Sequence, residues 1–290
     1  MHTIDPHEIE RRAVLALVLE PIVEKEGCTT RSRDIDASLR LIDLQGAGVN
    51  VGKYFYELAE RVNPDRSSRG ALDPAFANAI RHSSPRQTAE RSASNGVKRE
   101  KRQPHIFYDL VYKALEDSTK NLKNKKFVNL GLIELLFPVV LSQLVYGGTG
   151  TQVLKNVKKI LIESSPEDAR YKEKMLSRAW SSSKKSAKRN YPEQIGGKNL
   201  WEHYEKNLET AKEHDLKTSV LWCEQILKSF PVAQKMHGVA KKKLRKGLIG
   251  ALEEAYKRGF TQISKPGIIA DYTAVVAYLL LSENPKASLI

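Results

Sequence analysis

Residues 127–146 read FVNLGLIELLFPVVLSQLVY, and this stretch decides the fold class. A bilayer-spanning helix needs about 20 apolar residues, so this segment is nearly long enough to cross a membrane. Four polar side chains and a proline interrupt it: Asn129, Glu134, Pro138, Ser142 and Gln143. The proline is expected to break the middle of the helix. A segment that is apolar on every side but carries polar groups is typical of the centre of a helical bundle. We therefore expect a buried central helix and no membrane span.

Apolar residues recur at three- and four-residue spacing on both sides of this stretch, which predicts further helices. The predicted helices cover residues 7–26, about 39–62, a segment that starts near 106, and 268–281. The proline of Asn63-Pro64-Asp65 should end the second of them. No segment shows a convincing strand-like alternation. The expected fold is all-α: a single large helical bundle that spans residues 1–290.

Residues 82–104 are the exception to this pattern. They contain no leucine, isoleucine or aromatic residue and are rich in serine, arginine and lysine. Such a segment buries too little apolar surface to fold alone. We expect a basic, mobile insertion, which either contacts phosphates or is solvated.

The composition and the first residues of the chain indicate the cellular compartment of the protein. The chain has 290 residues, of which 41% are hydrophobic, and only two cysteines, Cys28 and Cys223. Two cysteines exclude a disulfide scaffold, and the seven histidines show no zinc-ligand spacing. Residues 1–8 have neither the basic nor the apolar part of a secretory signal. These features predict a cytoplasmic protein.

The charge balance points to anionic partners. The chain has 48 Lys and Arg against 34 Asp and Glu, a net charge of +14. Such an excess attracts nucleic acid, an anionic membrane surface or a phosphate-rich small molecule. A solvated lysine-rich surface gives the same count, since the basic residues, including the clusters at 184–189 and 241–246, are interleaved with acidic ones. Charge alone does not indicate an oligomeric state.

Three separated segments share a further pattern. The first places Glu20 near the end of a helix and Lys25, Gly27, Arg31 and Asp34 in the charged turn after it. The second, residues 129–138, reads NLGLIELLFP, and the third, residues 211–216, reads AKEHDL. In this order they resemble the triphosphoribosyl-dephospho-CoA synthase family, more its archaeal-type members than its citrate-lyase ones. The closing residues 284–290, NPKASLI, are also similar to the end of that family.

The resemblance implies an enzyme that transfers the triphosphoribosyl part of ATP to a hydroxyl of dephospho-CoA or a related cofactor precursor, with release of adenine. A triphosphate needs cations and usually Mg²⁺, and the attacking hydroxyl needs a carboxylate base. The expected catalytic carboxylates are Glu20, Asp34 and Asp215, of which Asp34 and Asp215 would also bind Mg²⁺. The expected phosphate- and substrate-binding residues are Lys25, Gly27, Arg31, Arg33 and Asn129.

Other roles for these residues and other functions stay open at this point. Glu20 and Lys25 could be exposed helix-end charges, Asp34 a helix N-cap, and Asn129 a satisfied buried amide. The chain departs from the family at Glu26, Val128 and Lys286, where the family has proline, threonine and aspartate. These departures suit a nucleotide-binding relative without catalysis. The net charge suits a non-catalytic protein that binds nucleic acid.

Overall fold

The computed structural model describes residues 4–25, 28–30, 40–62, 107–120, 129–181 and 195–289. The helices are α1 (Pro6–Leu19), α2 (Leu41–Asn50), α3 (Gly52–Val62), α6 (Tyr108–Thr119), α7 (Leu130–Tyr146), α8 (Thr151–Glu163), α9 (Pro166–Ser181), α10 (Leu200–Glu213), α11 (Lys217–Leu227), α12 (Pro231–Lys243), α13 (Leu248–Phe260) and α14 (Pro266–Glu283). Short 3₁₀ helices cover Glu20–Ile22 and Leu244–Lys246. No strand occurs in these ranges, which confirms the all-α prediction. The predicted insertion at 82–104 lies outside the described residues.

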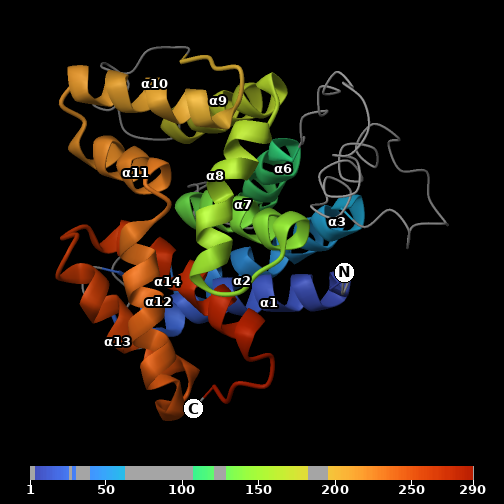
Figure 1. The fold of residues 1–290 in the computed structure, drawn as a ribbon, viewed down its shortest axis with the longest axis vertical. Coiled ribbons are helices and arrows are strands. Elements are labelled where there is room, and N and C mark those ends of the chain that lie inside the picture. Colours follow the sequence, from blue (N-terminus) through green and yellow to red (C-terminus); the bar gives the residue numbers. More distant parts are fainter. Residues whose placement is uncertain are drawn as a thin grey trace, which may run out of the picture.

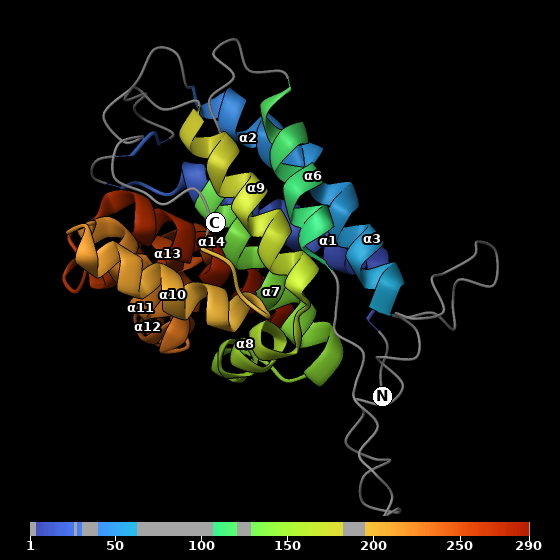
Figure 2. The ribbon, with the colours of Figure 1, turned by 90° about the horizontal axis from the view of Figure 1, so that it is seen from above.

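Helix α7 occupies the middle of the molecule, as its sequence predicts. Helices α10–α13 lie on one side of it, and α1–α3 with α6 lie on the other (Figures 1 and 2). Every residue of α7 from Leu132 to Val145 is buried. Among the described helices, none is long and apolar enough to cross a bilayer by itself; only α7 and α8 taken together meet that criterion, and they are bent by 97°.

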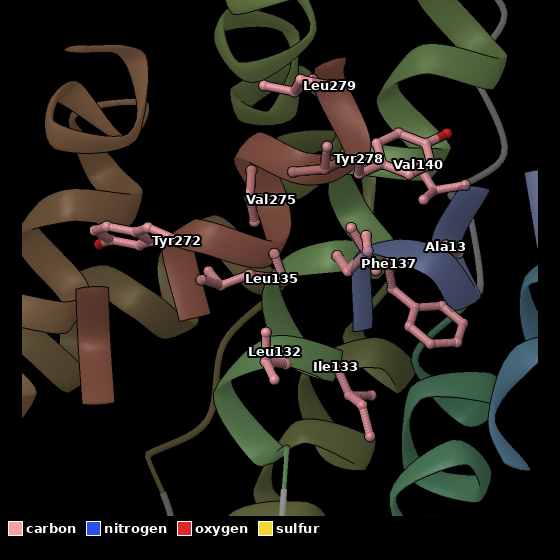
Figure 3. Packing of buried hydrophobic residues seen from close by; sticks show 14 of the residues in the cluster. Ala13, Leu132, Ile133, Leu135, Phe137, Val140, Tyr272, Val275, Tyr278 and Leu279 are labelled. Carbon is pink, nitrogen blue, oxygen red and sulfur yellow. The ribbon is translucent and has the colours of Figure 1, made fainter. Parts of the chain in front are cut away.

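The core around α7 is a continuous cluster of aliphatic and aromatic side chains. Phe137 stacks on Phe55 of α3 with ring centroids 4.3 Å apart. Figure 3 shows Phe137 and Val140 of α7 near Ala13 of α1 and Tyr278 of α14. Tyr278 also donates its hydroxyl to Oε1 of Gln143 at 2.6 Å, so this buried amide has a partner inside the core.

Pro138 does not break α7, contrary to the sequence prediction. The helix continues from Leu130 to Tyr146 with the proline inside it. A proline lacks the N–H that would bond the carbonyl four residues earlier, at a cost of about 3 kcal/mol. Packing on all sides of α7 outweighs this cost, because most helix stability in proteins comes from tertiary burial.

Two other boundaries differ from the expected ones. The helix predicted at 7–26 ends at Leu19, and the chain continues as a 3₁₀ turn that contains Pro21. The helix predicted at 39–62 is two helices, α2 and α3, separated at Val51. Gly52 begins α3 against α1, where a Cβ would lie only 2.6 Å from Cγ2 of Val14. The absence of a side chain at Gly52 therefore lets the backbone of α3 approach α1 closely.

Candidate functional site

A cavity of about 390 Å³ lies where three helices begin. Its wall contains the first turns of α7, α11 and α14, contributed by Leu130, Gly131, Thr218, Ser219 and residues 266–268. The same cavity is lined by side chains of α9 and α10. Its volume falls within the range of small-molecule sites, which runs from about 300 to 1,000 Å³.

The three helix starts share an electrostatic property. No described side chain caps the N-terminus of α7, α11 or α14. The first N–H groups of a helix have no intrahelical partner, and the aligned peptide dipoles place a partial positive charge there. Three such ends at one cavity favour an anionic ligand, and Lys265, which precedes α14 and lines the cavity, adds a full positive charge.

Local sequence explains why two of these helices begin where they do. Asn129 precedes α7 with a left-handed φ of 59°, a conformation that asparagine tolerates better than most residues. Its Nδ2 donates to the carbonyl of Leu44 at 3.4 Å, which connects α2 to the start of α7. Asp215 has a φ of 51° and turns the chain from α10 into α11.

A buried ion pair forms the inner part of the site. Lys172 of α9 donates to Oε1 of Glu134, and only 1% of Lys172 and 3% of Glu134 are exposed. Tyr204 of α10 donates its hydroxyl to the same Oε1 and accepts from Nζ of Lys172 at 3.1 Å. The ammonium also lies 4.2 Å from the centroid of the Tyr204 ring. This network joins α7, α9 and α10, and Glu134 and Lys172 both line the cavity.

Asp271 of α14 is the second carboxylate in the cavity wall. Among the described residues it forms no hydrogen bond and no ion pair. Burial raises the pKa of this carboxyl well above its ordinary value, and the negative charges of Glu20 and Glu134 act in the same direction, against the positive charge of Lys25. Asp271 can therefore hold a proton at a pH where most aspartates are ionised.

A second buried ion pair lies near Asp271. Lys25 donates to the backbone carbonyl and to Oε1 of Glu20, and both residues are buried. They are therefore not the exposed helix-end charges that the sequence left open. The same neighbourhood includes Cys28, whose pKa is raised to about 11, mainly by burial and against the charge of Lys25. At neutral pH this thiol is protonated and a poor nucleophile.

Of the three segments that carry the resemblance, the described structure places only the second in the cavity lining. The first supplies the Glu20–Lys25 pair, the second supplies Gly131 and Glu134, and the third leads directly into the start of α11. Of the predicted site residues, Asn129 adjoins the cavity wall through Leu130, whereas Asp215 is exposed and not part of the lining. Gly27, Arg31, Arg33 and Asp34 lie outside the described residues.

Sequence reasoning missed Asp271, Lys172, Tyr204, Asn207 and Trp222. A signal existed for Asp271, since it is the one charged residue within the apolar run 268–281. Lys172 carries no such signal, because the chain has 48 lysines and arginines. Trp222 lies in the wall and stacks on Tyr272 with centroids 6.4 Å apart and an interplanar angle of 13°.

The described residues contain no group of three or more histidine, cysteine or acidic side chains that could hold a metal ion. Of the two cavity carboxylates, Glu134 is already engaged by Lys172 and Tyr204, which leaves Asp271. These residues do not form a preformed Mg²⁺ site. Mg²⁺ is commonly bound by one or two carboxylates together with substrate phosphates, and the raised pKa of Asp271 disfavours the charged form that would bind it. No protein-family model, curated protein or solved structure matches this chain.

Proposed function

We propose that this chain is a nucleotide-dependent transferase that binds ATP in the cavity and transfers its triphosphoribosyl part to a hydroxyl acceptor, with dephospho-CoA or a related cofactor precursor as the acceptor class. The observation that carries the proposal is the meeting of three uncapped helix starts at a cavity that also contains two carboxylates. The sequence resemblance supports it, because the second of its three segments lines this cavity and the third precedes the start of α11.

The phosphates would lie against the helix starts. The N–H groups of Gly131, Ser219 and Gly267 lie in the first turns of α7, α11 and α14, where helices bind phosphate and sulfate groups. Lys265 would add a charge-assisted contact at the exposed edge of the cavity.

The transfer step needs a proton carrier beside the reacting sugar. The oxygen of the acceptor hydroxyl forms a bond to C1′ of the ATP ribose, and the bond from C1′ to N9 of adenine breaks. The protonated carboxyl of Asp271 would give its proton to the departing adenine, and the carboxylate left behind would take the hydroxyl proton of the acceptor, so that charge balances. Asp271 suits this role, since its environment favours the protonated form and it forms no competing hydrogen bond with described residues.

Glu134 suits a different role from Asp271. Positive charge develops on the sugar as adenine departs, and a nearby carboxylate stabilises it, as in glycoside cleavage. Lys172 and Tyr204 hold Glu134 in one position. Two carboxyl groups in unlike environments commonly divide the work in this way, one as the proton carrier and the other as the charged stabiliser.

The test is to incubate the purified chain with ATP, Mg²⁺ and dephospho-CoA and to measure free adenine by liquid chromatography. We expect adenine release, which Asp271→Asn lowers by a factor of roughly 10² to 10⁴ while ATP still binds. The matched control is Glu254→Gln, which removes an exposed carboxylate on α13 and should leave the rate unchanged.

Three outcomes of this test have different meanings. Binding of ATP without adenine release from any acceptor would contradict catalysis and favour the non-catalytic relative. Absence of ATP binding would contradict the whole proposal. An Asp271→Asn variant with the full rate of adenine release would exclude Asp271 as the proton carrier.

A further inference from the structure

We infer that Asn207 selects the base of the bound nucleotide by pairing its amide with the edge of adenine. This inference rests on the proposed function and adds to it a residue that determines specificity. Asn207 lines the cavity from α10, and it is 5% exposed. Because it follows Tyr204 by three residues, it lies on the same face of α10 as the residue that contacts Lys172 and Glu134.

The amide of Asn207 has unused hydrogen-bonding capacity. Its Oδ1 is buried and forms no hydrogen bond with any described residue. Buried polar groups in folded proteins almost always have a partner, and an unsatisfied one destabilises the fold. A buried amide that lacks a partner, on a residue that lines a ligand-sized cavity, therefore indicates that a ligand group supplies one when the amide turns toward the cavity.

The chemistry of a carboxamide indicates which group this is. It presents one acceptor and one donor side by side, so it pairs best with a neighbouring donor and acceptor on the ligand. The edge of adenine has this arrangement, with the N6 amino group as the donor and a ring nitrogen as the acceptor, and asparagine reads adenine in this way in protein–DNA complexes. The corresponding edge of guanine presents two acceptors, N7 and O6, which a carboxamide cannot pair with through both of its groups.

An aromatic wall accompanies the amide. Trp222 lines the same cavity and is partly exposed, and its indole is backed by Tyr272. Bases stack on such rings irrespective of their identity, so stacking adds affinity but not selectivity. Because stacking does not distinguish the bases, Asn207 is the residue that discriminates between adenine and guanine.

The experiment measures dissociation constants for ATP and GTP, each with Mg²⁺, by calorimetry on the intact chain. The wild type should bind ATP more tightly. Asn207→Leu should lower the ratio of ATP to GTP affinity by roughly 10- to 100-fold, the usual value of a bidentate base contact. Asn207→Asp should move the ratio further toward GTP, because a carboxylate only accepts and guanine offers the N1–H and the N2 amino group as donors.

Two measurements separate recognition from folding. The melting temperature of Asn207→Leu should equal or exceed that of the wild type, since the substitution removes an unsatisfied buried oxygen. The matched control is Asn156→Leu on α8: Asn156 is also buried, but its Oδ1 accepts from Nε2 of Gln152 at 3.3 Å, and it is not part of the cavity. That control should lower the melting temperature and leave the affinity ratio unchanged.

The results that would overturn the inference differ from those that would overturn the proposed function. If ATP binds but Asn207→Leu leaves the ATP-to-GTP ratio unchanged, or Asn207→Asp gives no shift toward GTP, the inference is wrong and the proposed function stands. If the wild type binds neither nucleotide, the proposed function is wrong and the inference fails with it.

Discussion

A Cβ placed on Gly131 would overlap Oδ2 of Asp271, so the backbone of α7 and the carboxyl group of α14 are in direct contact at the cavity wall. The same Cβ would lie 3.0 Å from Cη2 of Trp222. Glycine at this position therefore allows two cavity side chains to lie against the first turn of α7. The contact connects a sequence feature, the Asn-Leu-Gly segment, with the carboxylate that the proposed transfer step uses.

We expect Gly131→Ala to impair the site more than the fold. The added methyl group displaces Asp271 and Trp222 into the cavity, and ATP affinity should fall at least about 10-fold, which corresponds to about 1.4 kcal/mol. Replacing glycine by alanine stabilises a helix by about 1 kcal/mol. This gain offsets the cost of displacing the two side chains, so the free energy of unfolding should change little. Calorimetry and urea denaturation measure the two effects. Gly238→Ala, where a Cβ has open space, should stabilise the protein without changing ATP affinity.

The Lys172–Glu134 pair should show strong energetic coupling. Removal of one charge from a buried pair leaves the other unpaired, and we expect Lys172→Met or Glu134→Leu alone to lower the free energy of unfolding by about 3–5 kcal/mol. The double variant should recover much of this loss, since no unpaired charge remains. Urea denaturation of all four proteins gives the coupling energy.

The exposed pair Lys228–Glu224, with 3.3 Å between Nζ and Oε2, is the matched control for this cycle. Its coupling energy should stay below about 1 kcal/mol. If the loss of unfolding free energy in the Lys172–Glu134 double variant equalled the sum of the two single losses, the predicted coupling would be wrong.

Asp168 should be a structural residue rather than a catalytic one. It is fully buried, and its Oδ1 accepts from the backbone N–H groups of Phe107 and Tyr108, each at 2.8 Å. Its Oδ2 accepts from the N–H of Ser165 at 2.9 Å and from its hydroxyl at 2.8 Å. The carboxylate thus joins the start of α6 to the start of α9, the helix that carries Lys172.

Asp168→Ala leaves these buried donors without a partner, and we expect a loss of about 3 kcal/mol or more in the free energy of unfolding, measured by urea denaturation. Asp43→Ala provides a comparison, because Asp43 bonds the backbone N–H of Arg40 at the exposed start of α2. It should cost about 0.5–2 kcal/mol, as is usual for a helix cap. Equal losses of unfolding free energy in the two variants would show that the burial of Asp168 does not increase its contribution to stability.

The raised pKa of Asp271 predicts a pH dependence of both stability and binding. Folding favours the protonated carboxyl, so its contribution to stability is fully present below the ordinary value of 3.8 and is lost as the pH rises through the higher folded value. Over the same interval the site gains a negative charge, and its affinity for a triphosphate should fall. The negative charges of Glu20 and Glu134 act against this ionisation of Asp271, and the positive charge of Lys25 favours it.

Asp271→Asn removes the titration. Its stability relative to the wild type should increase with pH above 3.8, and its ATP affinity should depend less on pH than that of the wild type. Thermal melts and calorimetry on both proteins across the same pH series test this, and the comparison cancels the titration of the nucleotide itself. If stability and ATP affinity changed with pH in the same way in both proteins, the pH dependence could not be attributed to Asp271.

The amino-acid sequence by itself determined the fold class and the central helix. Residues 127–146 are apolar on all sides, and only burial inside a bundle accommodates such a helix in water. The last apolar helix was predicted for the same reason, at 268–281 against an observed Pro266–Glu283. The break at Val51 and the continuity of α7 through Pro138 were not predicted, because in both cases contacts with neighbouring helices outweigh local preferences.

Only the tertiary structure decided which polar residues meet. Glu134, Lys172, Tyr204 and Asp271 come from four helices, and periodicity gives the face of a helix but not its neighbour. The resemblance identified one segment that lines the cavity, residues 129–138, although several of the residues chosen from it and from the other two segments lie outside the described structure or outside the cavity lining. Whether a charged side chain is buried beside a partner depends on how the helices pack, and that packing sets both the raised pKa of Asp271 and the position of Lys172.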